Sequence, residues 1–120
     1  MAVARAHGLT SQIRRAAVSS AVNLAEGVAR LGRKECARFV DIAHGSLAEV
    51  QCLLRFGRDL GYLDEETWLV ASNASARAGA RVWGLLRALR REVTDAATGR
   101  PPSRRSPPSP PSPYTGGVSA

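Results

Sequence analysis

Proline, aromatic residues and long apolar runs are scarce in this 120-residue chain, and each scarcity excludes something. All 7 prolines lie between Pro101 and Pro113, so none interrupts a helix in residues 1–100. With only 2 Trp, 2 Tyr and 2 Phe, alanine and leucine must form most of the core, which favours close helix–helix packing. No run reaches the roughly 18 apolar residues of a membrane span, and residues 1–7 lack the apolar core of a secretory signal. We therefore expect a cytoplasmic protein that does not enter membranes.

Histidine and cysteine are too few and too dispersed for most catalytic or metal sites. Cys36 and Cys52 would lie about 24 Å apart on one helix, too far for a disulfide, so both are expected to be free thiols. His44 follows Asp41 at the spacing of di-iron carboxylate helices, but the second such pair that a complete site needs is absent. Neither a nucleophile elbow nor a glycine-rich phosphate loop is present. We expect no enzyme: no catalytic residue, metal, cofactor or small-molecule substrate.

Positive charge is plentiful, and arginine supplies nearly all of it, because Lys34 is the only lysine. The formal net charge is +7, and a basic surface attracts phosphate backbones without sequence preference. An arginine- and alanine-rich composition is also what a GC-rich genome produces, so the charge by itself leaves both interpretations open.

Apolar residues recur at steps of three and four in three segments, which predicts helices over about 10–31, 34–60 and 64–96. Thr10 and Asp64 stand where they could cap the first and third helices. Gly45 and Ser46, in the middle of the second, would let another backbone approach closely. The first helix has two adjoining apolar stripes: Ile13, Ala17, Ala21, Leu24 and Val28, and beside them Val18, Val22, Ala25 and Ala29. So wide an apolar arc indicates contact with two neighbours, as in an up-and-down, antiparallel all-α bundle.

Polar residues form a narrow seam along the first helix, with Gln12, Ser19, Asn23, Glu26 and Arg30 within about 40° of one direction. Two interpretations remain: a solvated face, or a buried or intersubunit seam of hydrogen bonds. Short Ser19 and Asn23 fit close packing better than solvation. Glu49, beside Ser46, could meet Arg15 or the seam. The candidate seam is Gln12, Arg15, Ser19, Asn23, Glu26, Ser46 and Glu49.

Two arginine clusters are candidate nucleic-acid contacts: Arg14 and Arg15, and then Arg30, Arg33, Lys34 and Arg38 around the first turn. Further arginines lie one helical turn apart in the third helix, at Arg77 and Arg81 and at Arg87, Arg90 and Arg91. No aromatic residue interleaves with any of these clusters, so we do not expect base stacking. Binding would be to phosphates, with weak sequence preference and steep salt dependence.

Several segments resemble a known bacterial family. They are Leu9-Thr10-Ser11-Gln12-Ile13-Arg14-Arg15-Ala16-Ala17-Val18-Ser19, Asn23-Leu24-Ala25-Glu26-Gly27, Phe39-Val40, Ile42-Ala43-His44-Gly45-Ser46-Leu47-Ala48-Glu49, Leu60-Gly61-Tyr62-Leu63 and Gly84-Leu85-Leu86. Over about residues 7–93 the chain resembles the 23S rRNA-intervening-sequence proteins, also called four helix bundle proteins. The resemblance implies a four-helix bundle that assembles with itself, as pentamers. It also implies, loosely, a role like that of related accessory proteins of diversity-generating retroelements, which bind nucleic acid.

The chain departs from the family at its start, because the family has a further helix before the block at Leu9. We therefore expect residues 1–8 to be a disordered remnant, residues 9–98 to form three of the four helices, and residues 99–120 to be a disordered Pro/Ser-rich tail. Three helices with wide apolar arcs would leave a groove unfilled, which predicts lower stability or pairing of copies through that groove.

The sequence thus predicts a non-catalytic, oligomerising helical module that binds RNA or DNA electrostatically, as an accessory to another protein. The alternative is a purely structural or protein-interaction module, or a selfish-element product without a nucleic-acid function.

Overall fold

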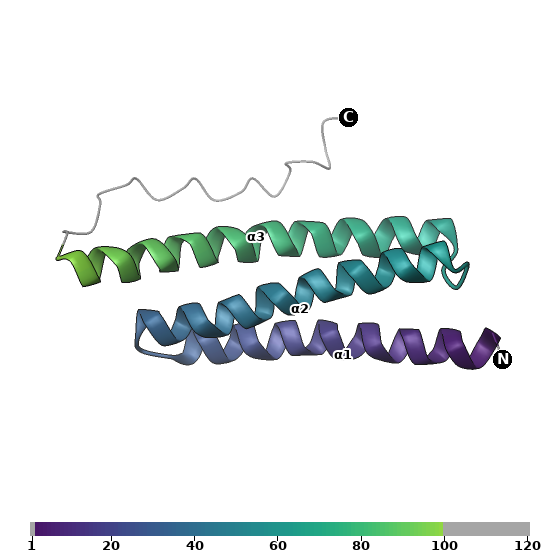
Figure 1. The fold of residues 1–120 in the computed structure, drawn as a ribbon, viewed down its shortest axis with the longest axis horizontal. Helices are drawn as coiled ribbons and strands as arrows, with labels where there is room; N and C mark the ends of the chain where they lie inside the picture. Colours follow the sequence, from purple (N-terminus) through teal and green to yellow (C-terminus); the bar gives the residue numbers. More distant parts are fainter. Residues whose placement is uncertain (1, 100–120) are drawn as a thin grey trace, which may run out of the picture.

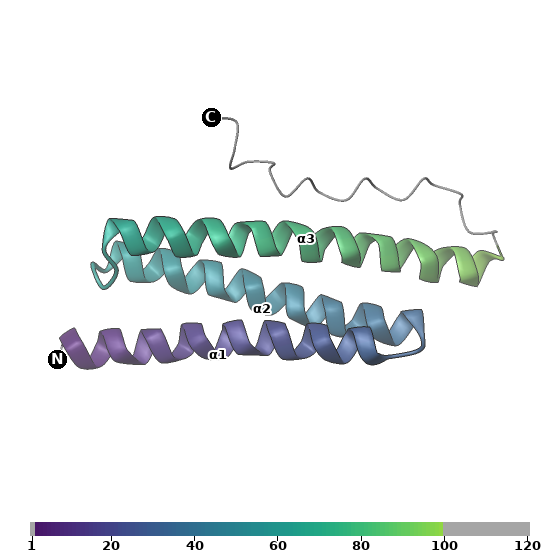
Figure 2. The ribbon, with the colours of Figure 1, turned by 180° about the vertical axis from the view of Figure 1, so that it is seen from behind.

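A computed structural model describes residues 2–99 of the chain as three long helices (Figure 1). They are α1 (Ala2–Ala29), α2 (Arg33–Asp59) and α3 (Glu65–Thr98). The helices run up and down, with α2 between α1 and α3 in both views (Figures 1 and 2). The predicted all-α, up-and-down fold is confirmed, and no strand occurs in residues 2–99. None of the three described helices has the length and apolar character that crossing a bilayer requires.

The start of α1 corrects the sequence prediction. The helix begins at Ala2, not near Thr10, so residues 2–8 are helical instead of a disordered remnant. The Thr10 hydroxyl donates to the Ala6 carbonyl at 2.9 Å, and it does not cap the helix. Alanine has the highest helix propensity and threonine can bond back to the preceding turn, so nothing local ends the helix at Thr10. The predicted disordered tail, apart from Gly99, lies outside the described residues.

α2 is the helix on which the other two pack, since the α-carbons of α1 and α3 nowhere come within 8 Å of each other in the described part of the chain. The core accordingly has two parts. One joins α2 to α3 and consists of Cys36, Val40, Ala43, Val82, Leu86 and Leu89. The other consists of Ala16, Val50 and Leu54, with Ile13, Leu63, Trp68 and Ala71 packed against it. Cys36 is buried, Cys52 is exposed, and both are free thiols, as predicted.

Glycines allow α1 and α2 to approach closely, although at different positions from the one predicted. A Cβ on Gly27 would lie 3.0 Å from the Phe39 Cβ and 3.2 Å from the Cys36 carbonyl oxygen of α2. A Cβ on Gly57 of α2 would lie 2.7 Å from Leu9 of α1. By contrast, Gly45 has no atom within 4 Å of such a position, so the prediction of a close approach at Gly45 was wrong. Gly45 lies on the outer side of α2, where no backbone packs against it.

The N-terminus of α3 is capped as the sequence predicted. The Asp64 carboxylate accepts a hydrogen bond of 2.7 Å from the Thr67 backbone amide. That backbone hydrogen bond, helped by the Thr67 side chain, lowers the pKa of Asp64 below its ordinary value. The chain turns into this cap through Gly61, whose φ of 76° is one that few other residues adopt.

Candidate nucleic-acid interface

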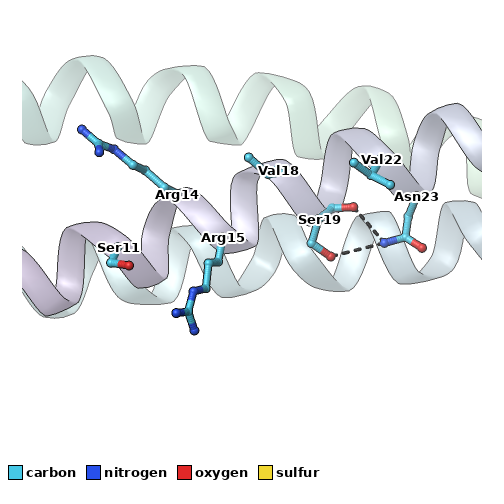
Figure 3. Close-up of a pocket in the computed structure, with 7 residues that line it drawn as sticks. All are labelled: Ser11, Arg14, Arg15, Val18, Ser19, Val22 and Asn23. Carbon is cyan, nitrogen blue, oxygen red and sulfur yellow. Dashed lines mark hydrogen bonds between the residues drawn. The ribbon is translucent and has the colours of Figure 1, made fainter.

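A shallow hollow of about 510 Å³ lies on the outer surface of α1. Its lining consists of seven residues of that one helix: Ser11, Arg14, Arg15, Val18, Ser19, Val22 and Asn23. Figure 3 shows Arg14 and Arg15 leaving α1 in different directions at one end, with Ser19 and Asn23 next to each other at the other end. The hollow therefore combines two cations, hydroxyl and amide groups, and the apolar surface of two valines.

Neither Arg14 nor Arg15 lies within 4.0 Å of a carboxylate in the part of the chain that the structure describes. Both arginines are exposed. Their charges are consequently available to an external anion without the loss of an internal ion pair. Guanidinium groups and small hydroxyls are the groups that proteins most often present to phosphate oxygens.

The residues of the predicted polar seam fall into a half-buried group and an exposed group. Ser19, Asn23 and Ser46 are half-buried between α1 and α2, where the hydroxyls of Ser19 and Ser46 are 3.0 Å apart. The Asn23 amide donates to the Ser19 carbonyl at 2.8 Å and to its hydroxyl at 3.2 Å. The Ser19–Ser46 contact thus joins α1 to α2 within the chain. The other seam residues are exposed: Gln12, Arg15, Glu26 and Glu49.

The expected meeting of Glu49 and Arg15 does not occur. No ion pair links them within residues 2–99, and Glu26 pairs instead with Arg30 on its own helix, at 3.1 Å. Arg15 lies on the outer surface of α1, whereas Glu49 projects from the exposed side of α2. The hydrogen-bonded part of the seam is therefore short and uncharged.

The second predicted cluster, around the turn from α1 to α2, is largely neutralised. Arg33 pairs with Glu92 at 3.1 Å and Arg38 with Glu35 at 3.4 Å, in addition to the pair of Arg30. The guanidinium groups of Arg30 and Arg38 also lie 4.9 and 4.6 Å from the centre of the Phe39 ring. Lys34 is exposed and has no ion-pair partner in residues 2–99. This cluster consequently presents less free positive charge than its sequence indicates.

A row of arginines on α3, outside the two predicted clusters, is here named the arginine row: Arg77, Arg81, Arg87 and Arg91. All four are exposed, and none has an ion-pair partner among the described residues. They lie within an arc of about 120° on the side of α3 away from α2. A signal in the sequence could have identified them, since residues 67–91 contain five arginines and no aspartate or glutamate.

Comparison with known proteins agrees with this architecture. The family model described as 23S rRNA-intervening sequence protein matches residues 2–83. The chain belongs to this family. A search of curated proteins found no match.

The region matched to the 23S rRNA-intervening sequence protein family contains the whole of α1 and α2 and the first part of α3. The hollow on α1 lies within it, as do Arg77 and Arg81, whereas Arg87 and Arg91 follow it. The match also begins at Ala2, so it includes residues 2–6, which precede the stretch that carried the resemblance.

Proposed function

We propose that this 23S rRNA-intervening sequence protein is a non-catalytic, self-associating module that binds RNA or DNA through its phosphates. The observation that carries the proposal is the set of exposed arginines without ion-pair partners in residues 2–99: Arg14 and Arg15 on α1, and the arginine row on α3. No acidic residue lies between Thr67 and Arg91, the stretch of sequence that carries the arginine row. Both surfaces therefore carry an uncompensated positive potential, which attracts polyanions over roughly a Debye length, about 8 Å at physiological salt.

The hollow on α1 supports phosphate binding in particular. Arg14 and Arg15 lie at one end, and the Ser11 hydroxyl is beside them. Such contacts position a protein on the backbone without reading the bases, so we expect weak sequence preference.

Self-association is supported by apolar surface on α1. Val18 and Val22 are 61% and 53% exposed, and α1 carries no charged residue from Ala16 to Ala25. A charge-free helical face that solvent can reach is the kind of surface that buries itself against another chain. The same surface would serve a partner protein, which is the alternative function considered above.

Salt-titrated binding tests the nucleic-acid proposal. Binding of a labelled oligonucleotide to the full chain is measured by fluorescence anisotropy between about 50 and 200 mM salt, a range over which phosphate contacts weaken steeply. The double variant Arg14→Gln/Arg15→Gln should bind several-fold more weakly, and the log–log salt slope should become shallower by about 1 to 2.

The matched control is Arg30→Gln/Arg38→Gln, which removes the same charge from side chains that are ion-paired and packed on Phe39. We expect a smaller loss of affinity from this control. Equal losses in the two double variants would show that only total charge matters, and absence of salt-dependent binding in the parent chain would contradict the proposal.

A further inference from the structure

An exposed tryptophan lies beside the arginine row, on the surface shared by α3 and α2. Trp83 is 42% exposed, although its neighbours Val82 and Leu86 are buried against α2. Trp83 lies between Arg81 and Arg87 in the sequence, so the expectation that no aromatic residue interleaves with the arginines was wrong at this position.

Two side chains hold the indole of Trp83 in place. The His44 ring of α2 lies 5.2 Å from it between ring centres, at a tilt of 37°. The guanidinium of Arg90 lies 6.0 Å from the indole centre and is itself paired with Asp41 of α2 at 3.2 Å. Contacts from both helices thus restrict the ring before any ligand arrives, which lowers the entropic cost of using it for binding.

The residues next to the ring on α3 are either small or positively charged. Ala80, one turn before Trp83, is exposed, and a Cβ on Gly84 would have no atom within 4 Å. Arg87 and Arg91 follow one and two turns later, about 6 and 12 Å along the helix axis. A flat ring with open space beside it and free arginines in line along the helix is the combination that binds single strands, by stacking a base and holding the adjacent phosphates.

We propose that Trp83, positioned by His44 and Arg90, stacks on an unpaired base while Arg87 and Arg91 hold the neighbouring phosphates. The preferred ligand is therefore single-stranded RNA or DNA, since the base faces of a duplex are already stacked on one another. This inference rests on the proposed nucleic-acid function and makes it more specific.

The chain has a second tryptophan that provides an internal control. Trp68 lies near the other end of α3, half-buried against the cluster of Val50 and Leu54. An arginine, Arg58, also lies over its ring, at 5.0 Å, and is paired with Glu65, as Arg90 is with Asp41. The two tryptophans thus differ in exposure and in the acidic residues near them in sequence, since Trp68 closely follows the acidic start of α3.

The experiment uses the full chain carrying Trp68→Phe, in which Trp83 is the only tryptophan, after circular dichroism has verified its fold. Oligo(dT), which does not pair with itself, should quench the Trp83 emission with the same midpoint as anisotropy reports for binding. A duplex of equal length at the same salt should bind without comparable quenching. Unchanged Trp83 emission at saturating oligo(dT) would overturn the proposal.

A second set of variants keeps the test independent of fluorescence. Trp83→Leu retains an apolar side chain but cannot stack, and should weaken oligo(dT) binding about tenfold while leaving duplex binding nearly unchanged. Trp83→Phe should retain most of the affinity. Equal weakening of single strand and duplex in Trp83→Leu would also overturn the stacking role. If the parent chain binds neither, the proposed function fails as a whole, whereas binding of both with equal affinity overturns the single-strand preference and leaves phosphate binding standing.

Discussion

At the scale of single residues, glycines decide how closely α1 and α2 can pack. The backbone of Gly27 is so near α2 that a Cβ there would meet the Phe39 Cβ at 3.0 Å and the Cys36 carbonyl oxygen at 3.2 Å. Neither atom is the end of a flexible side chain, so neither can move aside without shifting the helix. Gly45, in contrast, lies in the middle of α2 with open space around it.

Alanine at these two glycines should change stability in opposite directions. Gly45→Ala should raise the free energy of unfolding by about 0.5–1 kcal/mol, since it only restricts the unfolded chain and favours helix. Gly27→Ala should lower it by about 1–3 kcal/mol, because the added methyl group overpacks the contact with α2. Urea unfolding followed by circular dichroism measures both. Stabilisation by both substitutions would show that the contact at Gly27 can relax.

The cap of α3 predicts a pH dependence whose sign follows from the lowered pKa of Asp64. A carboxyl whose pKa is lower in the folded than in the unfolded chain adds stability above the unfolded-state pKa, near 3.8, and loses it as the pH falls through the folded-state pKa. Asp64→Ala should therefore lower the melting temperature at pH 7, and this difference from the parent should shrink as the pH falls below about 4. Asp64→Asn, which still caps, serves as the control. A difference that does not change with pH would contradict the role of the charge.

At the scale of helices, the sequence predicted the number and type of elements better than their limits or contacts. Periodicity identified all three helices because each has an apolar face that must be buried. It could not place the start of α1, since alanine-rich residues 2–8 have few apolar side chains to form a pattern, yet strongly favour helix. The close packing at Gly27 could not be predicted from the sequence either, because the sequence does not show whether a glycine inside a helix faces another backbone or solvent.

The docking of α3 on α2 should depend on one fully buried side chain. Leu86 is 0% exposed in the cluster with Val40 and Val82, whereas the adjacent Leu85 is 38% exposed. Leu86→Ala should cost about 2–5 kcal/mol, through lost burial and the cavity that remains. Leu85→Ala, with the same change in composition, should cost less than about half as much. Equal losses from the two variants in thermal or urea unfolding would mean that α3 does not dock through this face.

At the scale of the whole molecule, the placement of charge depends on contacts that no local pattern contains. Arg33 and Glu92, or Arg90 and Asp41, lie far apart in sequence and meet only because α2 packs against α3. The sequence therefore identified Arg14 and Arg15 but could not tell that Arg33 is paired. The arginine row was accessible to sequence reasoning, since Arg77, Arg81 and Arg87 have no carboxylate three or four residues away on their helix.

Self-association through α1 should depend on its charge-free face. Val22→Glu should lower the apparent molar mass of the full chain in sedimentation equilibrium at micromolar concentration, because a carboxylate cannot be buried there without a partner. Val70→Glu is the control, since Val70 is 66% exposed on α3 and outside that face. A parent chain that stays a monomer at all concentrations would contradict the proposal. Equal effects of the two substitutions would assign the interface elsewhere.

The separation of the α1 and α3 backbones by α2 has a consequence for how an assembly would bind a polyanion. Whatever covers the valines of α1 leaves Trp83 and the arginine row untouched, because α2 separates the two surfaces throughout the described chain. Each copy added through α1 would bring its own intact strand-binding edge. The length of nucleic acid protected from nuclease should then rise in steps with the number of subunits.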